Sequence, residues 1–111
     1  MKTFHLLTIT VAGVNFGAWA GELSILLEKQ RELRLVQEPE NFYDQYAIRV
    51  DTIHNAHGLS YKKLGYVPAV GAAHGILNRL LSAGYELTGK LSDNSDERQL
   101  FVHVHMKVHN T

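Results

Sequence analysis

The chain has 111 residues, enough for one domain with one hydrophobic core, and 45% of them are apolar with no low-complexity tract, which excludes extended disorder. Eleven Lys and Arg residues balance eleven Asp and Glu residues, so this neutral chain is not expected to bind a long run of duplex phosphates. The sequence has no cysteine, which excludes disulfides and thiolate sites and fits a reducing, cytoplasmic location.

The first two thirds of the chain predict strands and one short helix. Residues 3–14 alternate, contain many β-branched residues and predict a long first strand that closes on Gly13. A short helix is predicted over residues 21–29, and further strands are predicted over 31–36, 47–51 and 62–67. No apolar stretch reaches the roughly 18 residues of a membrane span, so no membrane partner is expected.

The remaining residues predict one longer helix and a final hairpin. Apolar residues recur at helical spacing from Ala69 to Ala83, and Gly84 stands where a glycine commonly ends a helix. Strands over 85–92 and 99–108 flank the turn sequence SDNSDE. The element order predicts a mainly β (α+β) fold: a small closed or nearly closed β-barrel of about six strands, with one main and one short helix, in a single domain over residues 1–111.

The segment EPENFYDQYAIRV, residues 38–50, concentrates more chemistry than a turn requires. Gly, Asn, Asp or Pro alone is sufficient to reverse a chain. Here a proline and an asparagine are accompanied by two tyrosines and by acidic residues, and Tyr43 stands next to Asp44. This composition indicates a binding function for the loop.

Four segments resemble the HIRAN domain family in their order and spacing. They are VAGVNF at 11–16, QEPENFYDQYAIRV at 37–50, KKLGYVP at 62–68 and AVGAAHGILNRLLSAG at 69–84, and together they span nearly the whole chain. The resemblance implies an OB-like β-barrel and a nucleic-acid binding module that recognises the 3′ end of single-stranded DNA, without catalysis and without a cofactor. It also implies a setting in DNA repair, with a helicase or nuclease as partner protein.

The resemblance further implies which residues line the DNA pocket. By position they are Phe16, Asn41, Tyr43, Asp44 and Tyr66. Aromatic faces stack on a terminal base without reading its identity. A carboxylate accepts a hydrogen bond from a free 3′-hydroxyl but repels a phosphate in the same place, so Asp44 is expected to recognise a strand end.

DNA-binding HIRAN domains contact phosphates through basic residues, and two of these positions differ here. Asn15 and Ala69 stand where those domains carry basic side chains. The cations that are candidates to replace them are Lys62, Lys63, Arg49 and Arg79. The predicted site therefore keeps Asn15 and adds Lys63.

Each predicted site residue also has a purely structural interpretation. Asp44 can cap its own loop through an Asx-type bond to backbone N–H groups. Tyr43 and Tyr66 can be half-buried residues of the barrel, Phe16 can belong to the core, and Asn41 can serve the loop alone. The sequence leaves these alternatives open.

Two functions other than DNA binding are also open. The same aromatic groove would suit a peptide, which makes a protein-interaction module the first alternative. A metal-dependent phosphodiesterase that uses Asp44, Asp51 and His54 is the second, although the sequence offers no P-loop and no recognisable catalytic triad.

The last predicted strand, FVHVHMKVHN, places alternate residues on opposite faces. One face carries Val102, Val104, Met106 and Val108, and the other carries His103, His105, Lys107 and His109. Zinc requires more ligands than two histidines on one strand, so we predict a solvated polar face and no metal site. His54 and His57 belong to a loop predicted over 54–58 and are expected to be exposed.

Overall fold

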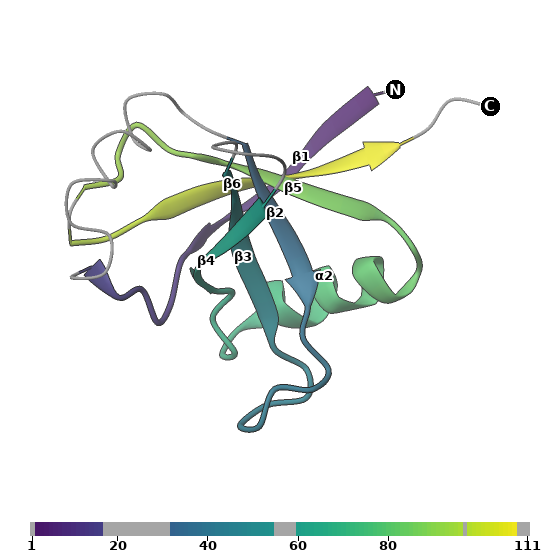
Figure 1. The fold of residues 1–111 in the computed structure, drawn as a ribbon. Coiled ribbons are helices and arrows are strands. Elements are labelled where there is room, and N and C mark those ends of the chain that lie inside the picture. Colours follow the sequence, from purple (N-terminus) through teal and green to yellow (C-terminus); the bar gives the residue numbers. More distant parts are fainter. Residues whose placement is uncertain (1, 17–31, 55–59, 97, 109–111) are drawn as a thin grey trace.

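The computed structural model describes residues 2–16, 32–54, 60–96 and 98–108 (Figure 1). These residues form six strands and one helix: β1 (Lys2–Thr10), β2 (Glu32–Gln37), β3 (Ile48–His54), β4 (Ser60–Tyr66), α2 (Ala72–Ser82), β5 (Glu86–Leu91) and β6 (Phe101–Val108). The short helix expected over 21–29 and most of the loop expected over 54–58 lie outside the described residues. No helix in the described ranges is long and apolar enough to span a membrane.

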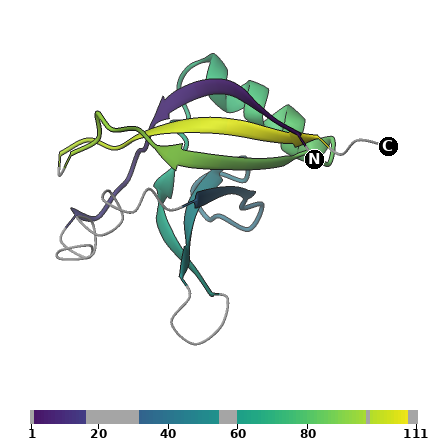
Figure 2. The ribbon, with the colours of Figure 1, turned by 90° about the horizontal axis from the view of Figure 1, so that it is seen from above.

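The six strands form one antiparallel sheet in the order β1-β6-β5-β2-β3-β4. This confirms the mainly β class, the six strands and the main helix. Of the expected closed or nearly closed barrel, the fully closed form is not found, because β1 and β4 are the two end strands of the sheet and do not pair along their lengths. Figure 2 shows β1, β6 and β5 together on one side of the molecule, with β2, β3 and β4 on the other.

One backbone bridge joins the two end strands within the described residues. Ala12, which follows β1, and Tyr66, which ends β4, exchange two N–H···O=C bonds of 2.8 Å each. The two backbones approach so closely that a Cβ atom on Gly65 would lie 2.5 Å from the Ala12 carbonyl oxygen. Because only glycine fits there, Gly65 allows the sheet to curl until its ends meet.

The hydrophobic core lies on one face of the sheet. Leu33 and Leu35 of β2 alternate with less buried residues, and Val102 and Val104 of β6 are completely buried. Leu77 of α2 belongs to the same buried cluster. A sheet with one packed and one solvated face requires this alternation, so the alternating strand pattern predicted from the sequence places the core correctly.

Helix α2 begins later than predicted because Gly71, at φ 107°, lies outside the helical region. Its end agrees with the prediction. Gly84, at φ 93°, donates its N–H to the Leu81 carbonyl oxygen (3.0 Å), and the Tyr85 N–H donates to the Leu80 carbonyl oxygen (3.1 Å). These two bonds form a Schellman motif, which satisfies carbonyl groups at the end of the helix.

The close approach at Gly65 predicts that Gly65→Ala lowers the free energy of unfolding by about 1 to 3 kcal/mol, because the new methyl group must displace backbone. Gly75→Ala is the matched control. Gly75 lies inside α2 with nothing within 4 Å of its Cβ position, so alanine should raise the free energy of unfolding by about 0.5 to 1 kcal/mol. Urea denaturation measures both variants, and effects of the same sign would contradict the argument.

Candidate nucleic-acid interface

The loop between β2 and β3 (residues 38–47, hereafter the β2–β3 loop) is shaped by its own polar side chains. Asn41 Oδ1 accepts the backbone N–H groups of Tyr43 (2.8 Å) and Asp44 (3.0 Å). Asp44 Oδ1 accepts the backbone N–H of Tyr46 (2.8 Å). Asx-type bonds of this kind replace the backbone pairing of a strand and give the loop a defined conformation.

Helix α2 holds the other side of the same loop. The Tyr46 carbonyl oxygen lies 2.8 Å from His74 Nε2 and accepts a bond of 3.2 Å from Asn78 Nδ2. Gln37 Nε2, at the end of β2, donates to Asn78 Oδ1 at 2.6 Å. An open cleft of about 830 Å³ lies between the loop and the helix, with Tyr46 and Arg79 among its lining residues.

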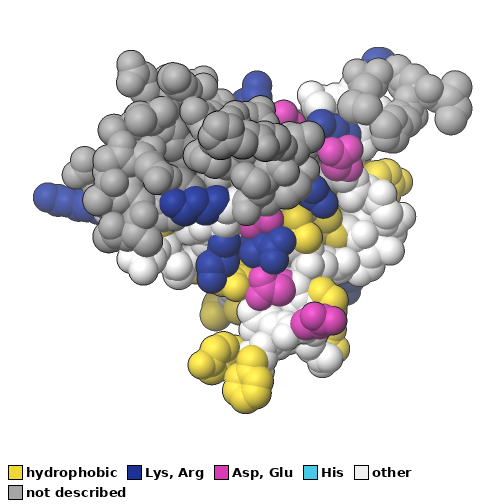
Figure 3. Space-filling model, in the orientation of Figure 1, with side chains coloured by type: hydrophobic (Ala, Val, Ile, Leu, Met, Phe, Trp, Pro, Cys, Tyr) yellow, Lys and Arg dark blue, Asp and Glu magenta, His cyan; other side chains and the backbone are white. Residues whose placement is uncertain are grey.

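The tip of the β2–β3 loop presents two aromatic rings to solvent. Phe42 and Tyr43 are 93% and 94% exposed, and their ring centroids lie 5.4 Å apart with planes at 86°. Figure 3 shows hydrophobic side chains that project at the lower end of this face, below a group of Lys, Arg, Asp and Glu side chains. Tyr43 is therefore not the half-buried sheet residue that its structural interpretation required. Exposed aromatic rings bordered by polar groups indicate an interaction surface.

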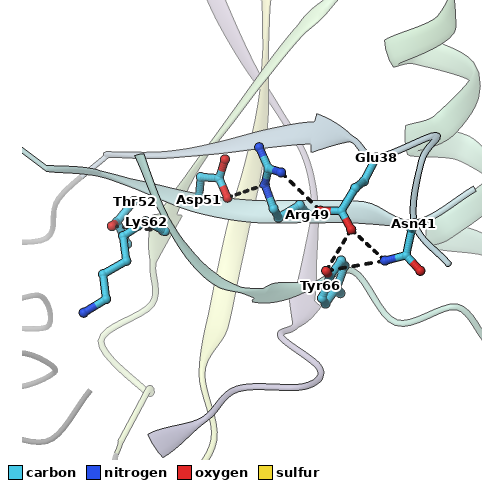
Figure 4. Close-up of polar contacts among 7 residues, drawn as sticks. All are labelled: Glu38, Asn41, Arg49, Asp51, Thr52, Lys62 and Tyr66. Atoms are coloured by element: carbon cyan, nitrogen blue, oxygen red, sulfur yellow. Dashed lines mark hydrogen bonds and ion pairs between the residues drawn. The ribbon is translucent and has the colours of Figure 1, made fainter. Parts of the chain in front are cut away.

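Behind the tip, Glu38 is the centre of a polar network (Figure 4). Its Oε1 atom accepts bonds from Asn41 Nδ2 (2.6 Å) and from the Tyr66 hydroxyl (3.0 Å). Its Oε2 atom accepts a bond from Arg49 Nη1 (3.1 Å), and Arg49 Nε donates to Asp51 Oδ1 (2.7 Å). The network thus ties the β2–β3 loop to β3 and to the end of β4.

A second, smaller cleft of about 360 Å³ opens over this network and is lined by Glu38, Arg49, Asp51, Lys63 and Tyr66 (hereafter the Glu38 cleft). Lys63 is exposed, and its Nζ atom lies 5.2 Å from the centroid of the Tyr66 ring, within the range of a cation–π contact. The two carboxylates of the cleft are balanced by one guanidinium and one ammonium group. The Glu38 cleft is therefore polar but close to neutral.

Hydrogen bonds keep the Glu38 carboxylate ionised. Partial burial raises the pKa of Glu38, but the bonds from Asn41, Tyr66 and Arg49 outweigh burial, so the pKa falls below its ordinary value of 4.5. The hydrogen bond to Asp51 is the main cause that raises the pKa of Arg49, and Glu38 adds to it. The network therefore holds charged partners at neutral pH.

The structure brings five of the predicted site residues into one region. Tyr66 and Lys63 line the Glu38 cleft, and Asn41 reaches it through its side-chain amide. Tyr43 and Asp44 lie farther along the same loop, and both donate their N–H groups to Asn41. Asn41 and Asp44 thus make the loop-shaping bonds that their structural interpretations require. A direct contact of any of these residues with nucleic acid stays a prediction.

The other two predicted residues follow β1. Phe16 is partly buried and packs against the hydrophobic core, as its structural interpretation expected, and Asn15 is exposed. Sequence analysis missed the role of Glu38. The alternation of β3 places Arg49 and Asp51 on one face and could have revealed that ion pair, but the contact of Glu38 depends on how the loop folds back.

Asp51, one of the residues of the phosphodiesterase alternative, is directed toward a guanidinium group. Its side chain is only 2% exposed, and Arg49 Nε donates to it at 2.7 Å. Across the described part of the chain, no group of three or more His, Cys, Asp or Glu side chains is arranged to hold a metal ion.

In the described residues, the chain is a small antiparallel β domain, whose open six-stranded sheet carries one helix and a polar cleft beside an aromatic loop. A family model for the HIRAN domain matches residues 6–109, so the chain is a member of the HIRAN domain family, which is generally linked to nucleic-acid binding. The resemblance seen in the sequence is thereby confirmed. The crystal structure of a protein from Lactobacillus plantarum is similar in fold, with a TM-score of 0.68, 24% sequence identity and 95% of each chain covered. No curated protein matches the sequence.

The lowered pKa of Glu38 predicts a loss of stability in acid. A carboxyl group whose pKa is lower in the folded than in the unfolded chain adds stability above its ordinary pKa and loses it as pH falls through the folded-state pKa. The free energy of unfolding should therefore fall below about pH 4.5.

Glu38→Gln should lower stability at pH 7 and make the acid dependence shallower, because the network loses its central charge. Glu40→Gln, which removes an exposed carboxylate from the same loop, is the matched control and should leave the profile nearly unchanged. Urea denaturation between pH 3 and pH 7 measures all three proteins. Identical profiles for the wild type and Glu38→Gln would contradict the assignment.

Proposed function

We propose that this protein binds single-stranded DNA at its 3′ end, through the β2–β3 loop and the Glu38 cleft, without catalysing a reaction. The exposed Phe42–Tyr43 pair, at the tip of a loop that Asn41 shapes, is the observation that carries the proposal. Membership of a family linked to nucleic-acid binding supports the class of ligand. Such a module would work beside a helicase or nuclease that exposes or processes strand ends.

The aromatic pair suits an unpaired base. A base that covers one ring face gains about 1 to 3 kcal/mol without being identified, because every base has a π-face. Phe42 and Tyr43 lie at 86° to each other, so a base stacked on one ring meets the edge of the other. Because the loop is already folded by its own hydrogen bonds, little backbone ordering opposes binding.

The charges near the Glu38 cleft support contact with few phosphates. Lys63 is the cation best placed to contact one, since it is exposed at the rim of the cleft. Arg49 is less available because its guanidinium group already bonds Glu38 and Asp51. A site with this balance favours a short strand terminus over an extended backbone.

In this proposal Asp44 provides the preference for a free end. Its Oδ1 atom accepts the Tyr46 N–H, and the carboxylate retains the capacity to accept a further donor. A 3′-hydroxyl can donate to such an oxygen, whereas a 3′-phosphate or a continuing phosphodiester would place like charges together. The carboxylate would thus distinguish the end of a strand from its interior.

One prediction of this proposal concerns how DNA affinity depends on salt concentration. If about one or two phosphates are neutralised, log affinity should fall with log salt concentration with a slope of about −0.7 to −1.4. Fluorescence-anisotropy titrations of a short oligonucleotide over a range of salt concentrations give this slope. A much steeper slope would show an extended cationic track and would contradict a small end site.

A further prediction of this proposal separates recognition of a DNA 3′ end from general binding of single-stranded DNA. A 3′-deoxy end should bind the wild type more weakly by about 1 to 3 kcal/mol, because the hydroxyl donor is lost. A 3′-phosphate end should bind more weakly still. Asp44→Asn should weaken binding of the hydroxyl end and relieve the penalty against the phosphate end. Tyr43→Ala should weaken both ends similarly, by about 1 to 3 kcal/mol.

Anisotropy titrations with oligonucleotides that differ only at the 3′ terminus provide the measurement. Glu40→Gln controls for the loss of one negative charge from the loop, and Phe4→Ala controls for the loss of an aromatic ring, since Phe4 is 49% exposed on β1. Equal binding of the three ends, or no binding at tens of micromolar, would remove the 3′-end proposal. A peptide ligand for the same aromatic surface would then take its place.

A further inference from the structure

Three histidines gather on the face of the sheet that is turned away from the core, where β1 pairs with β6. The ring of His5 packs against two rings of β6, with centroids 5.5 Å from His103 and 5.4 Å from His105. Thr8 Oγ1 lies 2.7 Å from His103 Nδ1 and orients that ring. His5, His103 and His105 are hereafter the histidine cluster. The alternation of β6 places His103 and His105 on one face, which the sequence predicts. His5 joins them only because β1 pairs with β6.

Charged groups of β2, β5 and β6 surround the histidine cluster, and Glu32 of β2 stands opposite Lys90 in the strand register. Lys90 of β5 stands opposite His103 in the strand register. The nearby carboxylates of Glu32 and Glu86 both bond Lys107, at 3.4 Å each. Across the described residues, Lys90 makes no ion pair with either of these carboxylates. The two lysines and the two glutamates balance one another, so these groups are neutral before any histidine is protonated.

Protonation of the cluster brings like charges together. Partial burial lowers the pKa of His105, and the neighbouring His5 and Lys90 lower it further. On the β2 side, Arg34 stands opposite Thr88, the residue that faces His105, and on its other side it stands opposite Asp51 of β3, so charges of both signs follow on the same face. Protonation of these histidines therefore adds positive charge to the face, and a bound anion would neutralise that charge.

We propose that the histidine cluster and Lys90 form a binding site for a phosphate-type oxyanion, which assembles as pH falls through the range in which histidine titrates. Imidazolium and ammonium N–H groups donate charge-assisted hydrogen bonds to such an anion. In the sheet order, β2 lies between β5, which carries Lys90, and β3, which borders the Glu38 cleft. The site is thus independent of the proposed 3′-end site, and its ligand is either a free anion or a phosphate of a nucleic-acid backbone.

Sulfate is the probe, because it remains a dianion between pH 5.5 and pH 8, so that any change in its affinity comes from the protein. Isothermal titration calorimetry is carried out at pH 5.5 and at pH 8, with the ionic strength held constant by chloride. Sulfate should bind about tenfold more tightly at pH 5.5 than at pH 8. Equal affinity at both values would overturn the proposal.

Three variants assign the effect to residues. His105→Gln should reduce the pH dependence, because one of the three rings that can be protonated is lost. Lys90→Gln should weaken sulfate binding at both pH values, because its charge does not change between them. His74→Gln is the matched control, since His74 lies on α2 and its ring contacts the Tyr46 carbonyl oxygen. An unchanged pH dependence in His105→Gln, or the same loss in His74→Gln, would refute the assignment.

Two further measurements keep the test decisive if a variant does not fold. In NMR spectra of the wild type at pH 5.5, sulfate should shift the ring signals of His5, His103 and His105 but not that of His74, and the opposite pattern would overturn the proposal.

A 3′-phosphorylated oligonucleotide, which the 3′-end site should reject, then identifies the source of the phosphate. Competition between it and sulfate at pH 5.5 assigns the site to nucleic-acid backbone, and its failure to compete assigns the site to free anions.

Discussion

Two backbone hydrogen bonds between Ala12 and Tyr66 hold together the ends of an open sheet, and the β2–β3 loop depends on the same contact. Tyr66 also donates its hydroxyl to Glu38, so one residue both closes the sheet and anchors the β2–β3 loop. The absence of a side chain at Gly65 permits this approach. A change that separates the two ends of the sheet would therefore displace the Glu38 cleft as well. The fold and the candidate site share one structural element.

The Glu38 network holds several charged groups in one cleft of a chain that has no net charge. Ions removed from water are tolerated when each has a partner of opposite charge, and Arg49 serves two carboxylates at once. Within the described residues, no buried side-chain nitrogen or oxygen lacks a hydrogen bond. Arg49 is thus occupied by its two ion pairs, whereas Lys63 lies exposed at the rim of the Glu38 cleft. This arrangement also explains why the affinity of the proposed interface should come more from its aromatic tip than from charge.

Local rules predicted much of the fold. The two-residue alternation around Val102 and Val104 and the terminal glycine at Gly84 depend on short-range sterics and burial, and both agree with the structure. Whether the sheet closes fully depends on the distance between β1 and β4, which no local pattern encodes, so the sequence predicted a closed or nearly closed barrel without deciding between the two. At the site, the loop residues could be found from the sequence because they are neighbours. The contact of Glu38 with Tyr66 could not, because it joins residues that only the folded sheet brings together.

The β2–β3 loop is bonded within itself and is attached to α2 through the Tyr46 carbonyl group, which has a kinetic consequence. A ligand that meets a preformed surface does not wait for a loop to order, so conformational search should not slow association. A chain with no net charge also provides little long-range attraction to speed the encounter. Discrimination between strands would then depend on residence time, because a strand end and a strand interior would arrive equally often but leave at different rates.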